Sequence, residues 1–129
     1  MNYCIFCKIV KKEISSHIVY EDENYLGLLD IHPASSGHTL LIPKKHYRWV
    51  ADVDDFGGYW EIARTIARKI ENRLSPMWVQ YFTHGAIDHA HIHIIPRYDN
   101  VEHSIELPKQ PSEAESEEIL KHVKEEINS

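Results

Sequence analysis

The sequence is poor in cysteine, in net positive charge and in long apolar runs, and each shortage excludes a class of protein. Two cysteines in 129 residues cannot form the disulfide framework of a small secreted domain. An excess of acidic residues gives a formal net charge of −6, which argues against a general nucleic-acid-binding surface. No apolar run is long enough to cross a bilayer, and the first residues lack the apolar core of a signal peptide. We therefore expect a cytoplasmic protein that binds neither nucleic acid nor a membrane.

Histidine, in contrast, is abundant, with ten residues in the chain. The apolar fraction of 43% is ordinary for a folded globular protein. The length fits one compact domain over residues 1–129, long enough to bury a core and short for two domains. The positions of the histidines are therefore the first place to look for function.

Five short stretches have the composition of β-strands and are separated by residues that favour turns. Asp22-Glu23-Asn24 is expected to be the turn between the first two strands. Pro43 and Pro96 end two of the others, because proline cannot donate a hydrogen bond to a neighbouring strand. The expected strands are residues 17–21, 25–30, 39–42, 77–83 and 89–95.

Three helices are expected around these strands. A short helix covers residues 5–11, and a long helix covers about residues 54–74. The apolar face of the long helix repeats every four residues, at Ile62, Ile66, Ile70 and Leu74. A final helix over residues 112–128 starts at the capping-box pair Ser112 and Glu115. The predicted fold class is α+β, a single antiparallel sheet of about five strands with one long helix packed on it and short terminal helices.

Imidazole and apolar side chains alternate along residues 89–95, with histidine at His89, His91 and His93. A strand has a period of two, so these three rings share one face and the apolar residues between them share the other. The apolar face is expected to pack against a helix, which displays the imidazoles in a row away from the core. The outer two residues of such a row start roughly 13 Å apart, at about 3.3 Å per residue, so one metal ion does not easily gather all three.

A row of imidazoles suits phosphate chemistry. A neutral imidazole is a good nucleophile near neutral pH, and a covalent intermediate splits one difficult displacement into two easier ones. A neighbouring imidazole can stabilise phosphate oxygens or assist the leaving group. The alternatives are an incidental run of surface histidines and a plain metal site.

The pattern His-x-His-x-His followed by two apolar residues resembles the defining motif of the histidine triad (HIT) family, and Pro96-Arg97 continues it as family members often do. Four earlier segments resemble family segments in the same order: residues 4–9, 19–23, 30–33 and 37–46. Together with the histidines they cover roughly half of the chain, within a motif core of about residues 4–98. Within the family, the chain is similar to the zinc-containing bacterial, Hint-like branch.

The resemblance implies a role for each of five residues. His91 would be the nucleophile that attacks the α-phosphate of a bound nucleotide, and His93 would contact the phosphate oxygens or assist the leaving group. Asp30 would hold the ribose hydroxyls, a role that its two acceptor oxygens suit, with a turn-capping role as the alternative. Leu28 and Ile31 would wall the base and sugar pocket, with plain core positions as the alternative.

Cys4 and Cys7 have the spacing of two metal ligands, and tetrahedral zinc needs two more. In the zinc-containing HIT proteins, histidines at the positions of His46 and His89 complete the set. The resemblance therefore implies a structural zinc ion at Cys4, Cys7, His46 and His89, which leaves His91 free, and no catalytic metal. The alternative is a pair of reduced, buried cysteines without metal.

The sequence departs from the family just before the histidines. Family members usually carry a glycine-rich segment with an early Asn, and a Gln four residues before the first histidine of the triad. Here residues 83–88 are shorter by several residues, and Gly85 stands at the position of that Gln. His84 is a candidate for the missing donor, so His84 and Gly85 are both candidate substrate-binding residues. His38 resembles a family position in a core strand, where a structural histidine is expected.

The resemblance implies a nucleotide-binding hydrolase that splits a nucleoside phosphoramidate or a dinucleoside polyphosphate through a covalent nucleotidyl-histidine, and releases a nucleoside monophosphate. A purine nucleotide or nucleotidyl conjugate would be its ligand. The alternatives are a nucleotidyltransferase and a nucleotide-binding regulator or scaffold with weak or no catalysis. A protein that only binds metal through its histidines is a further class. The resemblance also implies a homodimer.

Overall fold

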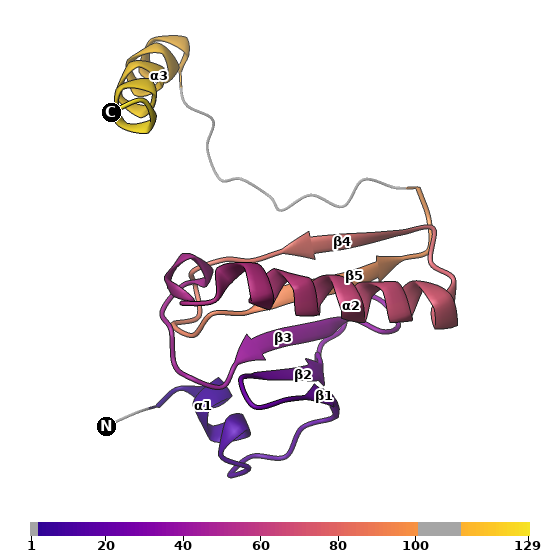
Figure 1. Cartoon of the computed structure of the whole chain (residues 1–129). Coiled ribbons are helices and arrows are strands. Elements are labelled where there is room, and N and C mark those ends of the chain that lie inside the picture. Colours follow the sequence, from indigo (N-terminus) through magenta and orange to yellow (C-terminus); the bar gives the residue numbers. More distant parts are fainter. Residues whose placement is uncertain (1–2, 101–111) are drawn as a thin grey trace.

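The predicted strands form and pair in one five-stranded sheet with the order β1-β2-β3-β5-β4, in which each neighbouring pair is antiparallel (Figure 1). This computed structural model describes residues 3–100 and 112–129. The strands are β1 Ile18–Glu21, β2 Tyr25–Leu29, β3 Thr39–Pro43, β4 Trp78–Phe82 and β5 Ile92–Arg97. The prediction of an α+β fold with a single antiparallel sheet is confirmed.

The predicted helices also form. They are α1 Ile5–Val10, the long α2 Phe56–Leu74 and α3 Glu113–Ile127, and a short 3-10 helix, η1, covers Val50–Asp52. The hydroxyl of Ser112 caps α3 by accepting a hydrogen bond from the backbone N–H of Glu115, as its capping pattern predicts. In the described part of the chain, none of these helices has the length and apolar character needed to cross a membrane.

Helix α2 packs on one face of the sheet, with an apolar stripe rotated from the predicted one. Its buried residues are Tyr59, Ala63, Ile66 and Ala67, whereas Leu74 is 44% exposed. The Tyr59 hydroxyl donates a hydrogen bond to the backbone oxygen of Leu41, and the Tyr59 ring stacks on Tyr25. This buried tyrosine therefore has the partner that its hydroxyl needs.

Both faces of the central strands are covered, which explains why β2 and β3 are almost continuously apolar. Tyr25 and Leu41 belong to a core cluster with α2 and with Ala90, Ile92 and Ile94 of the histidine segment. The alternate residues Leu26, Leu28, Leu40 and Ile42 form a second cluster with Phe6 and Ile9 of α1. Helix α1 therefore lies on the face of the sheet that carries the histidines.

The prediction of a strand over residues 89–95 whose histidines form a row away from the core was wrong in two respects. Strand β5 begins at Ile92, so His89 and His91 precede it. Pairing with β3 stops at Leu41 and Ile92. Before this point the Ala90 N–H donates to the Tyr47 carbonyl, and the Pro43 carbonyl accepts from the His89 side chain. His89 and His91 are 0% exposed and His93 is 9% exposed, since α1 covers this face and its Phe6 ring lies beside the rings of His89 and His91.

Two turns place the remaining site residues. The carboxylate of Asp22 accepts hydrogen bonds from the backbone of Asn24 and Tyr25, which confirms the predicted turn between β1 and β2. Between β2 and β3, Gly37 adopts a φ of 94°, a conformation that favours glycine. The antiparallel pairing of β2 and β3 then brings Asp30 beside His38, where the Asp30 N–H donates to the His38 carbonyl.

Candidate functional site

Most of the predicted site residues line one cavity of about 260 Å³. We call it the histidine cavity; its polar wall contains Asp30, His84, His91 and His93. Its apolar wall comes from α1, from Leu28 and Leu40 of the sheet, and from Ile31 at the rim, which is 73% exposed. Leu28 is 3% exposed and belongs to the core as well as to the cavity wall.

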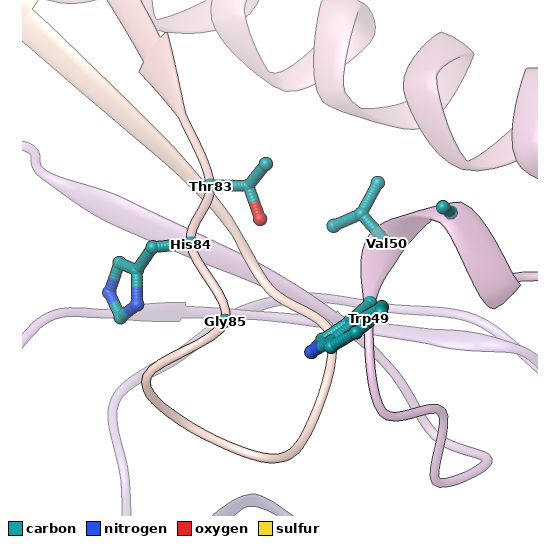
Figure 2. Close-up of a pocket in the computed structure, with 6 residues that line it drawn as sticks. Trp49, Val50, Thr83, His84 and Gly85 are labelled. Atoms are coloured by element: carbon teal, nitrogen blue, oxygen red, sulfur yellow. The ribbon is translucent and has the colours of Figure 1, made fainter. Parts of the chain in front are cut away.

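Gly85 lies elsewhere. It faces a second cavity of about 440 Å³, between the loop that follows β4 and η1, which we call the Trp49 cavity. Figure 2 shows the backbone of His84 and Gly85 passing between Trp49 and the His84 ring, which points away from this cavity. The two cavities therefore lie on opposite sides of the same short segment, and of the residues that the structure describes only His84 lines both.

His91 is held in a single tautomer. Its Nδ1 lies 2.9 Å from the carbonyl oxygen of His89, which can only accept, so Nδ1 carries the hydrogen and Nε2 carries the lone pair. Thr83 fixes the same segment, because its hydroxyl donates to the His91 carbonyl at 2.6 Å. Burial lowers the pKa of His91, and the nearby His84 lowers it further. The ring is therefore a neutral imidazole with its nucleophilic nitrogen on the cavity side.

His93 is oriented by His38, a contact that the sequence did not predict. The Ala34 N–H donates to Nδ1 of His38 at 3.0 Å, which leaves the hydrogen of His38 on Nε2. This Nε2 lies 2.9 Å from Nδ1 of His93 and donates to it, so His93 carries its own hydrogen on Nε2. That atom is buried and has no hydrogen-bond partner among the described residues. A buried donor without a partner is costly unless a ligand satisfies it, so Nε2–H of His93 is a candidate donor to a phosphate oxygen.

Asp30 divides its two oxygens between two tasks. Oδ1 accepts a hydrogen bond from the backbone N–H of His32 at 2.8 Å, which is the turn-capping alternative. Oδ2 lies 3.5 Å from Nε2 of His38 and 4.0 Å from Nδ1 of His93. One carboxylate oxygen therefore stays on the histidine side of the turn, in the wall of the cavity.

Three imidazoles, His84, His91 and His93, offer nitrogens within 4.8 Å of one another, a spacing that could hold a metal ion. A metal ion needs a lone pair from each ring. Nδ1 of His84 accepts from the Ala86 N–H, and Nδ1 of His93 accepts from His38. Both rings therefore carry their hydrogen on Nε2. The cluster therefore offers one lone pair flanked by two donors, which fits an anion better than a cation.

A second cluster has the opposite character. The ligand atoms of Cys4, Cys7, His46 and His89 lie within 4.8 Å of one another. Nδ1 of His89 is 3.2 Å from the Cys4 sulfur, 3.5 Å from the Cys7 sulfur and 3.2 Å from Nδ1 of His46. Zinc bonds of about 2.0–2.3 Å in a tetrahedron give edges of roughly 3.3–3.8 Å between ligand atoms. These distances and this donor set fit zinc.

The outer nitrogens of both histidines support this fit. Nε2 of His89 lies 2.8 Å from the carbonyl oxygen of Pro43, so Nε2 carries the hydrogen and Nδ1 is free for a metal. Nε2 of His46 faces the Asp88 carboxylate at 4.0 Å. Cys4 caps the first turn of α1 and Cys7 lies one turn later, so an ion at this cluster would tie α1 to the sheet.

The acid sensitivity of the fold should come in part from His93. Burial, with smaller effects from His91, His38 and His84, lowers the pKa of His93 to about 4. An unfolded histidine takes up its proton near pH 6.5, so the unfolded state binds more protons than the folded state at pH values from 6.5 down to 4. The free energy of unfolding should therefore fall as the pH drops, by about 3 kcal/mol from this residue between pH 7.5 and pH 4.

Urea denaturation at the two pH values measures this effect. The His93→Gln protein lacks the titrating group, so its stability should fall less than that of the wild type over the same interval. Equal losses in the two proteins would contradict the assignment to His93.

These arrangements of histidine and cysteine can be compared with known proteins. The HIT domain model matches residues 11–100. The chain belongs to the HIT domain family. Among its relatives in the HIT family, the adenosine 5′-monophosphoramidase of Schizosaccharomyces pombe is 34% identical over 132 aligned positions, which cover 98% of this chain and 96% of that protein.

Solved structures of HIT proteins share the fold. A HIT family member from Bacillus subtilis matches with a TM-score of 0.79 and 33% identity, over 98% of this chain and 96% of that one. A zinc-bound histidine triad family protein from Mycobacterium smegmatis matches with a TM-score of 0.72 and 30% identity, over the same shares of the two chains. The yeast relatives named as adenosine 5′-monophosphoramidases associate nucleotide hydrolysis with the HIT family.

Proposed function

We propose that this protein is a nucleotidyl hydrolase in which Nε2 of His91 attacks the α-phosphate of a nucleoside phosphoramidate or a dinucleoside polyphosphate. The observation that carries the proposal is the tautomer of His91, whose Nδ1–H is held by the His89 carbonyl and whose Nε2 lone pair faces the histidine cavity. A preset neutral imidazole needs no base to activate it.

The reaction has two displacements. In the first, a bond forms between His91 Nε2 and phosphorus, and the bond to the leaving group breaks, with its electron pair departing on the leaving group. In the second, a water oxygen bonds to phosphorus and gives up a proton to solvent, the bond between phosphorus and Nε2 breaks with its electron pair returning to Nε2, and the nucleoside monophosphate is released. His93 supports both steps, because its Nε2–H, without a partner in the described part of the chain, can donate to a phosphate oxygen as negative charge accumulates there.

The rest of the histidine cavity fits the nucleoside. Oδ2 of Asp30 is the acceptor for a ribose hydroxyl, while Oδ1 keeps its turn contact. Leu28 and Ile31 line the apolar part, which suits a purine ring.

We also propose that Cys4, Cys7, His46 and His89 hold a structural zinc ion. The ligand distances and the hydrogen bond from His89 to Pro43 support it. Bound zinc would fix α1 over the histidine cavity, and it takes no part in either displacement. Reduced cysteines in a ligand set also fit a cytoplasmic location.

The test is to incubate the protein with adenosine phosphoramidate and with diadenosine polyphosphates. Release of AMP is followed by chromatography, and any covalent adduct is located by mass spectrometry of peptides from quenched samples. AMP release together with an adenylyl group on His91 supports the hydrolase. Adduct formation with transfer to an added alcohol or amine in preference to water would favour a nucleotidyltransferase, and tight AMP binding without turnover would favour a regulator.

A homodimer is proposed as well. Phe56 at the start of α2 is 47% exposed and Tyr81 on β4 is 41% exposed, with Trp60 between them in ring contact with both. An exposed aromatic group of this kind is typical of an interface. Light scattering at micromolar concentration should give the mass of two chains, and Trp60→Arg should shift it to one. A single-chain mass for the wild type would contradict the dimer.

A further inference from the structure

His84 occupies a position that neither the fold nor the zinc cluster explains. It lies on the loop between β4 and β5, with its Nε2 atom 3.2 Å from Nε2 of His91. Its ring also lies roughly parallel to the rings of Phe82 and His93, with centroids 6.1 and 5.6 Å away. His84, whose ring contacts the proposed nucleophile, is exposed and lies outside the sheet.

Backbone contacts establish the direction of this hydrogen bond. The N–H of Ala86 donates to Nδ1 of His84 at 3.2 Å, so the hydrogen of His84 is on Nε2. His91 has the opposite tautomer, with its hydrogen on Nδ1 and its lone pair on Nε2. The contact is therefore a hydrogen bond donated by His84 to the nucleophilic lone pair of His91. In the free protein, His84 caps the atom that must attack phosphorus.

We propose that His84 is a catalytic residue that transfers this hydrogen bond to a non-bridging oxygen of the α-phosphate when substrate binds, an inference that rests on the proposed function. An attacking atom stands about 3–3.5 Å from its target in a productive complex. The phosphate oxygens then lie around His91 Nε2 within reach of a donor that is now 3.2 Å from that nitrogen. His84 and His93 would each give one Nε2–H to the phosphate, on either side of the lone pair of His91.

In this role His84 is a neutral donor and not a general acid. Its Nδ1 already accepts from Ala86, so the ring carries one hydrogen, and loss of that hydrogen would leave an imidazolate. In the step itself, the lone pair of His91 forms the bond to phosphorus, the bond to the leaving group breaks, and a leaving group that needs a proton takes it from water. The N–H of His84 stays intact and its hydrogen bond strengthens as charge grows on the oxygen.

The backbone that carries His84 is held from both sides. On one side, Thr83 donates to the His91 carbonyl at 2.6 Å. On the other, the Trp49 indole lies so close to Gly85 that an added Cβ would meet its nitrogen at 3.0 Å (Figure 2). The backbone of His84 therefore stays in place, and with Nδ1 still held by Ala86 the Nε2–H is available to a phosphate oxygen beside the lone pair of His91.

Two variants separate the N–H from the shape of the ring. His84→Phe keeps a flat ring beside Phe82 and removes the donor, whereas His84→Gln keeps an N–H donor. His17→Phe, at an exposed histidine outside the cavity, is the matched control. The substrates are adenosine phosphoramidate, with a poor leaving group, and adenosine 5′-(4-nitrophenyl phosphate), with a good one. We expect His84→Phe to lower kcat/KM by about 100-fold for both substrates, with the pH profile unchanged in shape. The kcat/KM of His84→Gln should be at least about tenfold higher than that of His84→Phe.

Other results would overturn the inference. Unchanged kcat/KM in His84→Phe makes the residue a bystander, and a loss confined to the phosphoramidate makes it an acid for the leaving group. If the wild type turns over neither substrate, the proposed hydrolase function is wrong. AMP binding measured by calorimetry then tests the role of His84 separately. About tenfold weaker AMP binding in His84→Phe, but not in His84→Gln, supports the phosphate donor, and equal binding overturns it.

Discussion

In the His91→Ala protein, the covalent nucleotidyl adduct is expected to be absent, and kcat/KM for adenosine phosphoramidate is expected to fall by about 10⁴-fold or more. The reason is that the described part of the cavity offers a lone pair at Nε2 of His91 and hydrogens at Nε2 of His84 and His93. Neither neighbour can replace the nucleophile without losing the contact that sets its tautomer. Added imidazole should restore part of the rate, since the alanine leaves room for a free ring in the cavity.

The loss must be shown to come from chemistry and not from unfolding. The Phe6 ring packs beside the His91 ring, so the replacement of His91 by alanine also leaves a void under α1. The variant should still bind AMP and keep its far-ultraviolet circular dichroism, and His17→Ala should retain full activity. A His91→Ala protein that still forms an adduct, or turns over near the wild-type rate, would contradict a nucleophilic role for this residue.

Local pattern predicted the elements well because strands and helices here follow the periodicity of their own residues. The turn at Asp22-Glu23-Asn24, the strand that ends at Pro43 and the capping pair of α3 were all confirmed. Each depends on interactions within a few residues, which a sequence displays directly.

Tertiary packing accounts for what the pattern missed. Alternation of His89, His91 and His93 predicted one row of rings away from the core, but the pattern does not show that α1 lies over that face. The His89 side chain turns toward the two cysteines, and its Nε2 donates to the Pro43 carbonyl. Along α2, the buried face includes Tyr59, whose hydroxyl donates to the Leu41 carbonyl on the sheet.

The arrangement of the candidate site was predicted only in part, again because a local pattern does not report tertiary packing. The cluster of Cys4, Cys7, His46 and His89 follows the resemblance residue by residue, and the structure brings all four side chains together. The link from His38 to His93 depends on β3 and β5 being neighbours in the sheet, which no local pattern reports. The only available signal was a histidine immediately before an apolar strand.

Zinc is expected at one ion per chain, and Cys7→Ser is expected to lose it together with most of the activity. Cys7 is buried in α1 and its sulfur lies 3.2 Å from Nδ1 of His46, so serine removes a ligand that a hydroxyl does not replace. Zinc bound only by the folded chain stabilises it by about 4 kcal/mol when free zinc is 1,000-fold above its dissociation constant. Without that contribution α1 should detach locally, and the histidine cavity would lose the wall that Phe6 and Ile9 supply.

Metal analysis and thermal denaturation, with and without a chelator, measure these effects. Lys11→Ser, at the exposed end of the same helix, is the control and should keep both zinc and stability. His91→Ala should also keep its zinc, because the His91 side chain is not one of the four ligands and its Nδ1 contacts the backbone carbonyl of His89. Zinc that remains in Cys7→Ser but disappears in His91→Ala would place the metal on the histidine cavity, and the nucleotidyl chemistry proposed for His91 would then have to be abandoned.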